Sequence, residues 1–112
     1  MPFFMHQWTY KDPQVRAMVT HPQDRAEIVR DAIETFGGKL HSFFFSFGGY
    51  DGMCITEFPD NKTALASLMS IVGSGGLSTI KTTVLVTQEE AKAAMMLAHD
   101  LVAPYTPPSG KK

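Results

Sequence analysis

The sequence predicts one α+β domain in which helices cover one face of a four-stranded antiparallel sheet. Four short segments rich in aromatic and β-branched residues alternate with helical segments, and two of these segments are joined only by the turn Gly48-Gly49-Tyr50-Asp51. The resulting order of strand, helix, strand, strand, helix, strand is the split βαβ pattern of a ferredoxin-like fold, whose two crossovers put both main helices on one sheet face. An extra helix follows at the C-terminus, and the domain is expected to span residues 1–103.

The first part of the chain is expected to form a strand and two helical segments. Residues 3–9 are aromatic-rich and end at a Tyr-Lys-Asp-Pro turn. Residues 14–20 predict a helix interrupted at His21-Pro22, because proline more often begins a helix than continues one. In the longer helix that follows, apolar residues recur every three or four positions up to Phe36, and Gly37-Gly38 ends it. Charges of alternating sign from Asp24 to Glu34 predict that its other face is exposed to solvent.

The second part continues with a hairpin, a helix, a strand and a last helix. Residues 40–47 and 53–58 are the two strands of the hairpin. Asp60 is predicted to cap a helix that ends before Gly73, and residues 78–86 form the fourth strand. Thr87 is predicted to cap a helix that runs to about Val102, with two glutamates in its first turn. Residues 104–112 are expected to be a disordered tail.

Alternation along the hairpin predicts which side chains share a sheet face. If residues 47 and 52 flank the turn, one face carries His41, Phe43, Phe45, Phe47, Cys54, Thr56 and Phe58. The opposite face carries Leu40, Ser42, Phe44, Ser46, Met53, Ile55 and Glu57. Because both faces include apolar side chains, one is expected to form the core under the helices, and the other, more mixed face an interface between two copies of the chain.

Composition limits the possible function classes. The 112 residues are 44% hydrophobic and 19% charged, which fits a single small domain. The net charge is −1 and no basic stripe is present, so nucleic acid is not an expected partner. Cys54 is the only cysteine, which excludes an internal disulfide and favours a reducing, cytoplasmic location. The apolar start of the chain lacks a basic leader, and no run approaches the ~20 apolar residues that span a bilayer, so no membrane association is expected.

Several short motifs resemble, in order and spacing, those of the GYD-domain family. They include Gln7-Trp8-Thr9, Gly37-Gly38-Lys39-Leu40, Gly49-Tyr50-Asp51 and Thr87-Gln88-Glu89-Glu90, and the resemblance covers roughly residues 2–95. It implies a dimeric α+β barrel with a pocket for a small apolar ligand between sheet and helices, but no single activity. His6 and His41 depart from the family pattern, so a role for either would be particular to this chain.

Two groups of residues are candidates for a functional site. Tyr50 and Asp51 put a phenol and a carboxylate at a hairpin tip, where they could share a proton or orient a ligand; the alternative is that Asp51 binds backbone amides and Tyr50 covers the core rim. His6 and Trp8 alternate with Tyr10 on one face of the first strand, which would suit a planar ligand; the alternative is core packing with the imidazole bonded to a buried polar neighbour.

Metal and cofactor chemistry are not expected. The four histidines lie on different predicted elements without the close spacing of metal ligands. Cys54 is expected to behave as a small, unreactive core residue.

The leading functional hypothesis is a cytoplasmic homodimer that holds a small apolar or aromatic molecule between sheet and helices. Its site would include His6, Trp8, His41, Tyr50 and Asp51, beside a cavity of ~300 Å³ or more near Tyr50. One alternative is a cofactor-independent monooxygenase or isomerase-like enzyme with His6 or Asp51 as the base. Another is a non-catalytic assembly or regulatory module with a filled core. The sequence does not decide whether the protein is an enzyme.

Overall fold

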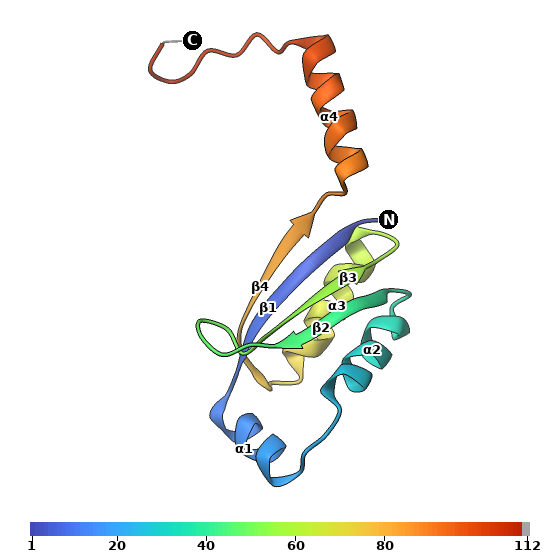
Figure 1. Cartoon of the computed structure of the whole chain (residues 1–112), viewed down its shortest axis with the longest axis vertical. Coiled ribbons are helices and arrows are strands. Elements are labelled where there is room, and N and C mark those ends of the chain that lie inside the picture. The colour runs from blue at the N-terminus through green and yellow to red at the C-terminus, as the bar shows by residue number, and fades with distance from the viewer. Residues whose placement is uncertain (111–112) are drawn as a thin grey trace.

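The computed structural model describes residues 1–110 and shows an antiparallel sheet with helices on one side (Figure 1). The strands are β1 (Phe3–Tyr10), β2 (Lys39–Phe45), β3 (Gly52–Glu57) and β4 (Leu77–Leu85), in the spatial order β2-β3-β1-β4. The helices are α1 (Asp12–Thr20), α2 (Arg25–Thr35), α3 (Asn61–Gly73) and α4 (Gln88–Leu101). This arrangement confirms the predicted ferredoxin-like α+β fold.

The two predicted helix caps are present. Asp60 precedes α3, and its Oδ1 accepts the N–H of Thr63 at 2.9 Å. Thr87 precedes α4, and its Oγ1 accepts the N–H of Glu90 at 3.1 Å. Each side chain satisfies one of the amides that a helix start leaves without an intrahelical partner.

The first two helices begin at other residues than expected. Helix α1 begins at Asp12 rather than at residue 14, because Pro13 fits in a first turn, where no amide proton is needed. Helix α2 begins at Arg25, three residues after the expected break, because Asp24 is its cap and accepts the N–H of Glu27 at 3.2 Å.

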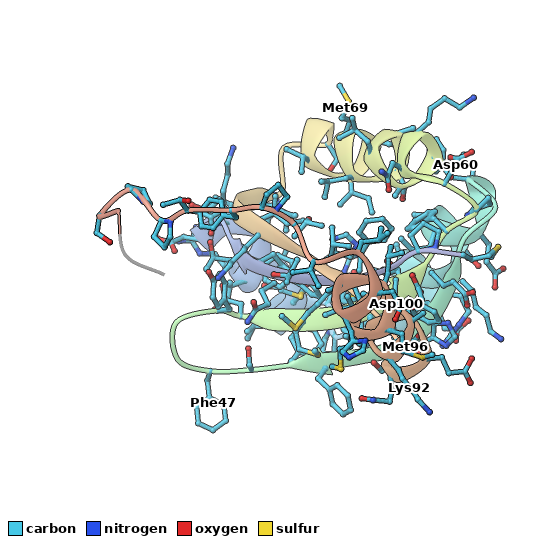
Figure 2. All side chains as sticks on the ribbon, turned by 90° about the horizontal axis from the view of Figure 1, so that it is seen from above. Phe47, Asp60, Met69, Lys92, Met96 and Asp100 are labelled. Atoms are coloured by element: carbon cyan, nitrogen blue, oxygen red, sulfur yellow. The ribbon has the colours of Figure 1, made fainter. Side chains whose placement is uncertain are left out.

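The hairpin register differs from the prediction in two respects. The last paired residues are Phe45 and Gly52, so Phe47 lies in the loop, where it projects away from the domain (Figure 2). A bulge directly after Leu40 adds one residue to β2. Leu40 therefore lies on the helix-covered face and is buried, whereas His41 lies on the opposite face. The predicted positions of these two residues were exchanged, because strict alternation takes no account of a bulge.

The core consists of two clusters between the sheet and helices α2 and α3. One is built around Phe4, Ile33, Phe58 and Ala64. The other is built around Trp8, Leu40 and Cys54. Along β1 the buried, polar His6 lies between Phe4 and Trp8, so the apolar core is interrupted at its centre.

The opposite sheet face and α4 lie outside this core. In Figure 1 no helix lies over the sheet face that is turned toward the viewer, and α4 stands beyond the end of the sheet. No residue of α4 is buried. The Cα radius of gyration is 18.4 Å, whereas a compact domain of this length has roughly 13 Å.

The tail that was expected to be disordered is only partly described. Residues 104–110 contain no helix or strand, and residues 111–112 lie outside the described residues. Between residues 1 and 110, no helix is both long and apolar enough to cross a bilayer.

Candidate functional site

A partly open cavity of about 70 Å³ lies between the sheet and helices α2 and α3. We call it the inner cavity. Strands β1, β3 and β4 form its floor, and its apolar walls include Val29, Ile33, Phe58, Leu68, Ile71 and Ile80. It lies where the family resemblance implied a pocket, but it is smaller than the expected cavity and Tyr50 is not part of its lining.

Two polar atoms in the lining of the inner cavity are buried without a hydrogen-bond partner among the described residues. They are the indole Nε1 of Trp8 and the hydroxyl Oγ of Ser67, in side chains that are 5% and 1% exposed. A buried polar group left unpaired costs about 1–3 kcal/mol, so such groups are rare in folded proteins. Both groups line the same cavity, where a bound molecule could provide their partners.

Gly52 holds Trp8 in this position. A Cβ atom at residue 52 would lie 2.5 Å from the Trp8 indole, which is closer than any real contact of that kind. Gly52 is the residue on β3 that pairs with Trp8, and its lack of a side chain leaves room for the indole there. Trp8 also packs against Phe43, with ring centroids 5.4 Å apart.

His6 also lines the inner cavity, but both of its ring nitrogens have partners. Its Nδ1 is 2.9 Å from Thr82 Oγ1 on β4, and its Nε2 is 3.0 Å from Thr56 Oγ1 on β3. In the neutral ring one nitrogen donates its proton to a threonine and the other accepts a hydroxyl proton. Burial lowers the pKa of His6 to about 4, which keeps the ring neutral near pH 7. The arrangement corresponds to the structural alternative for this residue.

Cys54 lies beside His6 on β3 and lines the same cavity. Burial raises the pKa of its thiol to about 12, although the backbone amide of His6 partly opposes that rise. A thiol that stays protonated at neutral pH is a poor nucleophile.

Asp51 lies at the hairpin tip and binds backbone. Its Oδ2 accepts the N–H of Tyr10 at 2.8 Å, and its own N–H donates to the carbonyl of Trp8 at 2.8 Å. Tyr50 is half-buried, and its carbonyl accepts a hydrogen bond from the Ser46 hydroxyl at 2.8 Å. The Asp51 carboxylate thus extends the pairing of β1 with β3 by one residue.

His41 lies on the open sheet face, away from the inner cavity. Its Nε2 is 2.8 Å from Glu57 Oε1, and its ring centroid is 5.3 Å from that of Phe3. Of the five predicted site residues, the structure therefore brings only His6 and Trp8 together at the inner cavity. Asp51 borders a separate open groove of about 380 Å³ between α1 and the hairpin tip.

A second cavity of about 300 Å³, which we call the outer cavity, adjoins the inner one. The two share Tyr10, Arg25, Ile71 and Leu77 in their linings. Helix α1 forms part of the outer wall through Gln14, Ala17 and Met18. Among residues 1–110, Arg25 is the only charged residue that lines either cavity.

Three residues at or beside the inner cavity are not among the predicted site residues, although the sequence carries a signal for each. Ser67 follows Ala64 by three positions, so it lies on the same helix face in an otherwise apolar run. Arg25 was included in the exposed charged face of its helix, yet it is partly buried at the helix start. Gly52 directly follows Asp51, and a glycine at the start of a strand indicates close approach by another group.

Among residues 1–110, no three His, Cys, Asp or Glu side chains gather as metal ligands would. The expectation of no metal or cofactor stays a prediction.

Comparison with known proteins identifies the family. No curated protein matches the chain significantly. The profile of the GYD domain matches residues 4–95, a range that includes the sheet, the inner cavity and the first half of α4. The chain therefore belongs to the GYD-domain family.

Proposed function

We propose that this protein binds a small, mostly apolar molecule in the inner cavity. The observation that carries the proposal is a pair of buried polar atoms, Trp8 Nε1 and Ser67 Oγ, in a mostly apolar lining. Neither atom has a hydrogen-bond partner within residues 1–110. Ligand sites typically combine apolar walls with a few polar groups that orient the ligand. A ligand oxygen that accepts the Trp8 proton and bonds the Ser67 hydroxyl would satisfy both.

The side-chain chemistry favours binding over catalysis. A general base must offer a free electron pair to the reacting proton. Both nitrogens of His6 are occupied by threonines, and the Asp51 carboxylate is bonded to the Tyr10 amide outside the inner cavity. With His6 as the base, the monooxygenase or isomerase-like alternative would require that ring to release Thr56 or Thr82 when substrate binds. With Asp51 as the base, the reaction would have to take place outside the inner cavity.

Ligand binding can be tested by thermal unfolding and by the fluorescence of Trp8, the only tryptophan in the chain. We expect at least one member of a panel of small aromatic compounds and quinones to raise the melting temperature and change the Trp8 emission. At a concentration of ~100 times its dissociation constant, a ligand adds ~2.7 kcal/mol to the free energy of unfolding.

Two serines of α3 provide a matched pair of variants for this test. Ser67→Ala should weaken the binding of any ligand that the panel identifies, because it removes a hydroxyl from the cavity wall. Ser70→Ala changes an exposed residue of the same helix and should leave binding unchanged. A panel in which no compound changes either signal would contradict the proposal.

The proposal includes a homodimer formed through the open sheet face. Apolar side chains from all four strands lie next to one another on that face, namely Phe3, Met5, Phe44, Met53, Ile55 and Leu85. Specific interfaces bury ~800 Å² per partner, and a four-stranded sheet can supply such an area. A cytoplasmic location is part of the proposal and fits a chain whose one cysteine is unpaired.

The homodimer can be tested by sedimentation with two Met→Lys variants. Met5→Lys puts a charge at the centre of the open face and should produce a monomer. Met69→Lys is the control, because Met69 is 64% exposed on the side of α3 away from the sheet (Figure 2). A parent protein that sediments as a monomer at micromolar concentration would exclude this interface.

A further inference from the structure

We infer that the ligand is an apolar acid whose carboxylate binds Arg25. This inference rests on the proposed function and adds to it the chemical class of the ligand and its orientation. The mostly apolar body would occupy the inner cavity, with an oxygen that bonds Trp8 and Ser67, and the carboxylate would lie in the outer cavity.

The guanidinium of Arg25 has N–H donors that are not used within the described chain. It is partly buried, and its Nη1 donates to Gln23 Oε1 at 2.8 Å. No carboxylate of the described chain forms an ion pair with it, whereas Arg30 on the same helix pairs with Glu27. A guanidinium carries five N–H donors, so most of those of Arg25 remain free for a ligand.

The charged side chain in the lining of the two cavities indicates an anionic ligand. Arg25 lines both of them, and neither lining contains an Asp or Glu. A carboxylate matches the planar guanidinium because it can accept two parallel N–H bonds. With one cation available, a singly charged carboxylate is matched better than a phosphate group, which carries up to about two negative charges near pH 7.

The cavity volumes indicate how such a ligand would lie. A cavity of about 150 Å³ in another protein admits benzene, so the inner cavity of about 70 Å³ is too small to enclose a ring completely. A ring-sized molecule would therefore extend across the shared boundary into the outer cavity of about 300 Å³. Arg25 lies on that boundary, where it can reach the outer end of the molecule.

The inference can be tested with two pairs of compounds that differ only in the head group. One pair is para-hydroxyphenylacetate and para-hydroxyphenylethanol, and the other is 8-hydroxyoctanoate and octane-1,8-diol. Dissociation constants are measured by calorimetry, with Trp8 fluorescence as a second readout. We expect the acid to bind at least about tenfold more tightly than the alcohol in at least one pair, as a charge-assisted hydrogen bond would provide.

Two arginines of α2 supply the matched variants. Arg25→Gln should remove the preference for the acid and leave the affinity for the alcohol unchanged. Arg30→Gln removes the same charge from the same helix outside both cavities, so it should preserve the preference. Equal melting temperatures of the two variants would establish that any difference in affinity is local.

The outcomes separate the inference from the proposed function. If acid and alcohol bind equally, or if Arg25→Gln keeps the preference, the acid assignment is wrong although the cavity binds ligands. If none of the four compounds binds and the aromatic and quinone panel also fails, the proposed function falls and the acid assignment with it. If the panel binds while neither acid does, the acid assignment alone is overturned.

Discussion

His6 joins three strands through its ring, and this role makes stability depend on pH. Burial lowers its pKa from the ordinary value of 6.5 to about 4 in the folded chain. Between these two pH values the unfolded chain binds a proton that the folded chain does not. The free energy of unfolding should therefore fall as the pH falls from about 6.5 to about 4, by about 3 kcal/mol for the whole shift.

This pH dependence can be measured by urea unfolding at several pH values between these limits. His6→Gln should be less stable than the parent near neutral pH and should lose less stability on acidification, because glutamine does not titrate. His21→Gln changes an exposed histidine and should keep the slope of the parent. Equal slopes for His6→Gln and the parent would exclude His6 as the cause.

Asp51 provides a test between a structural and a chemical role. Because its Oδ2 accepts the Tyr10 amide, Asp51→Asn should keep much of that bond and lower the free energy of unfolding by under ~1 kcal/mol. Asp51→Ala should lower it by ~1–2 kcal/mol, since the amide loses its partner. Both variants should bind ligand normally, as Asp51 lines neither the inner nor the outer cavity. Normal folding of Asp51→Asn combined with lost ligand affinity would instead indicate a chemical role.

Gly52 and Gly49 allow a test of the Trp8 position. Gly52→Ala would put a methyl group 2.5 Å from the indole, and overpacking of this kind typically lowers the free energy of unfolding by about 1–3 kcal/mol. Gly49→Ala adds the same methyl group where no atom lies within 4 Å and should change stability little. Chemical denaturation with Trp8 emission as the signal compares the two, and equal stabilities would contradict the close packing of Trp8 on β3.

At the scale of the element, α4 buries no side chain against the rest of the described chain. Its 14 residues include the apolar stripe Ala91, Ala94, Met95, Ala98 and Leu101, and none of these side chains is buried. Isolated helices of this length are marginal in water, and most helices in proteins depend on the packing of one face. We therefore expect α4 to be stable only when a second copy covers its apolar stripe.

Hydrogen exchange at two protein concentrations tests this expectation. The amides of α4 should exchange rapidly in dilute samples and become protected as the dimer forms. Those of α3, which contributes the buried Ala64 and Ser67, should be protected at both concentrations and serve as the internal control. Protection of α4 that does not change with concentration would show that the helix needs no partner.

The elements could be predicted from the sequence more fully than their contacts. Caps such as Asp60 and Thr87 depend on local chemistry, so the helix starts that they define were predicted correctly. The bulge after Leu40 has no local signature, and it exchanged the faces of Leu40 and His41. The site was predicted only in part, because alternation along a strand places His6 and Trp8 on one face but does not give contacts between elements. The hydrogen bonds of His6 to two threonines and the cavity beside Arg25 are contacts of that kind.

At the scale of the whole molecule, a small core and a large exposed apolar surface occur together. The two core clusters contain seven buried residues, whereas the open sheet face and α4 remain uncovered in the single chain. If two copies share these surfaces, association and folding are linked, and the melting temperature should rise with protein concentration. Differential scanning calorimetry over a hundredfold concentration range would measure this. Met5→Lys should remove the dependence, and Met69→Lys should retain it.

Helix α1 has a consequence for the speed at which a ligand would come and go. It borders the outer cavity, yet none of its residues is buried. Two features attach the start of α1 to the sheet. One is the chain that continues from β1, and the other is the Lys11 N–H, which donates to the Gly76 carbonyl at 3.1 Å. Displacing a segment that buries so little surface costs little free energy, so its opening is expected to be frequent. We therefore expect rapid association and short residence times, which suit a protein that takes up and passes on a molecule rather than one that stores it.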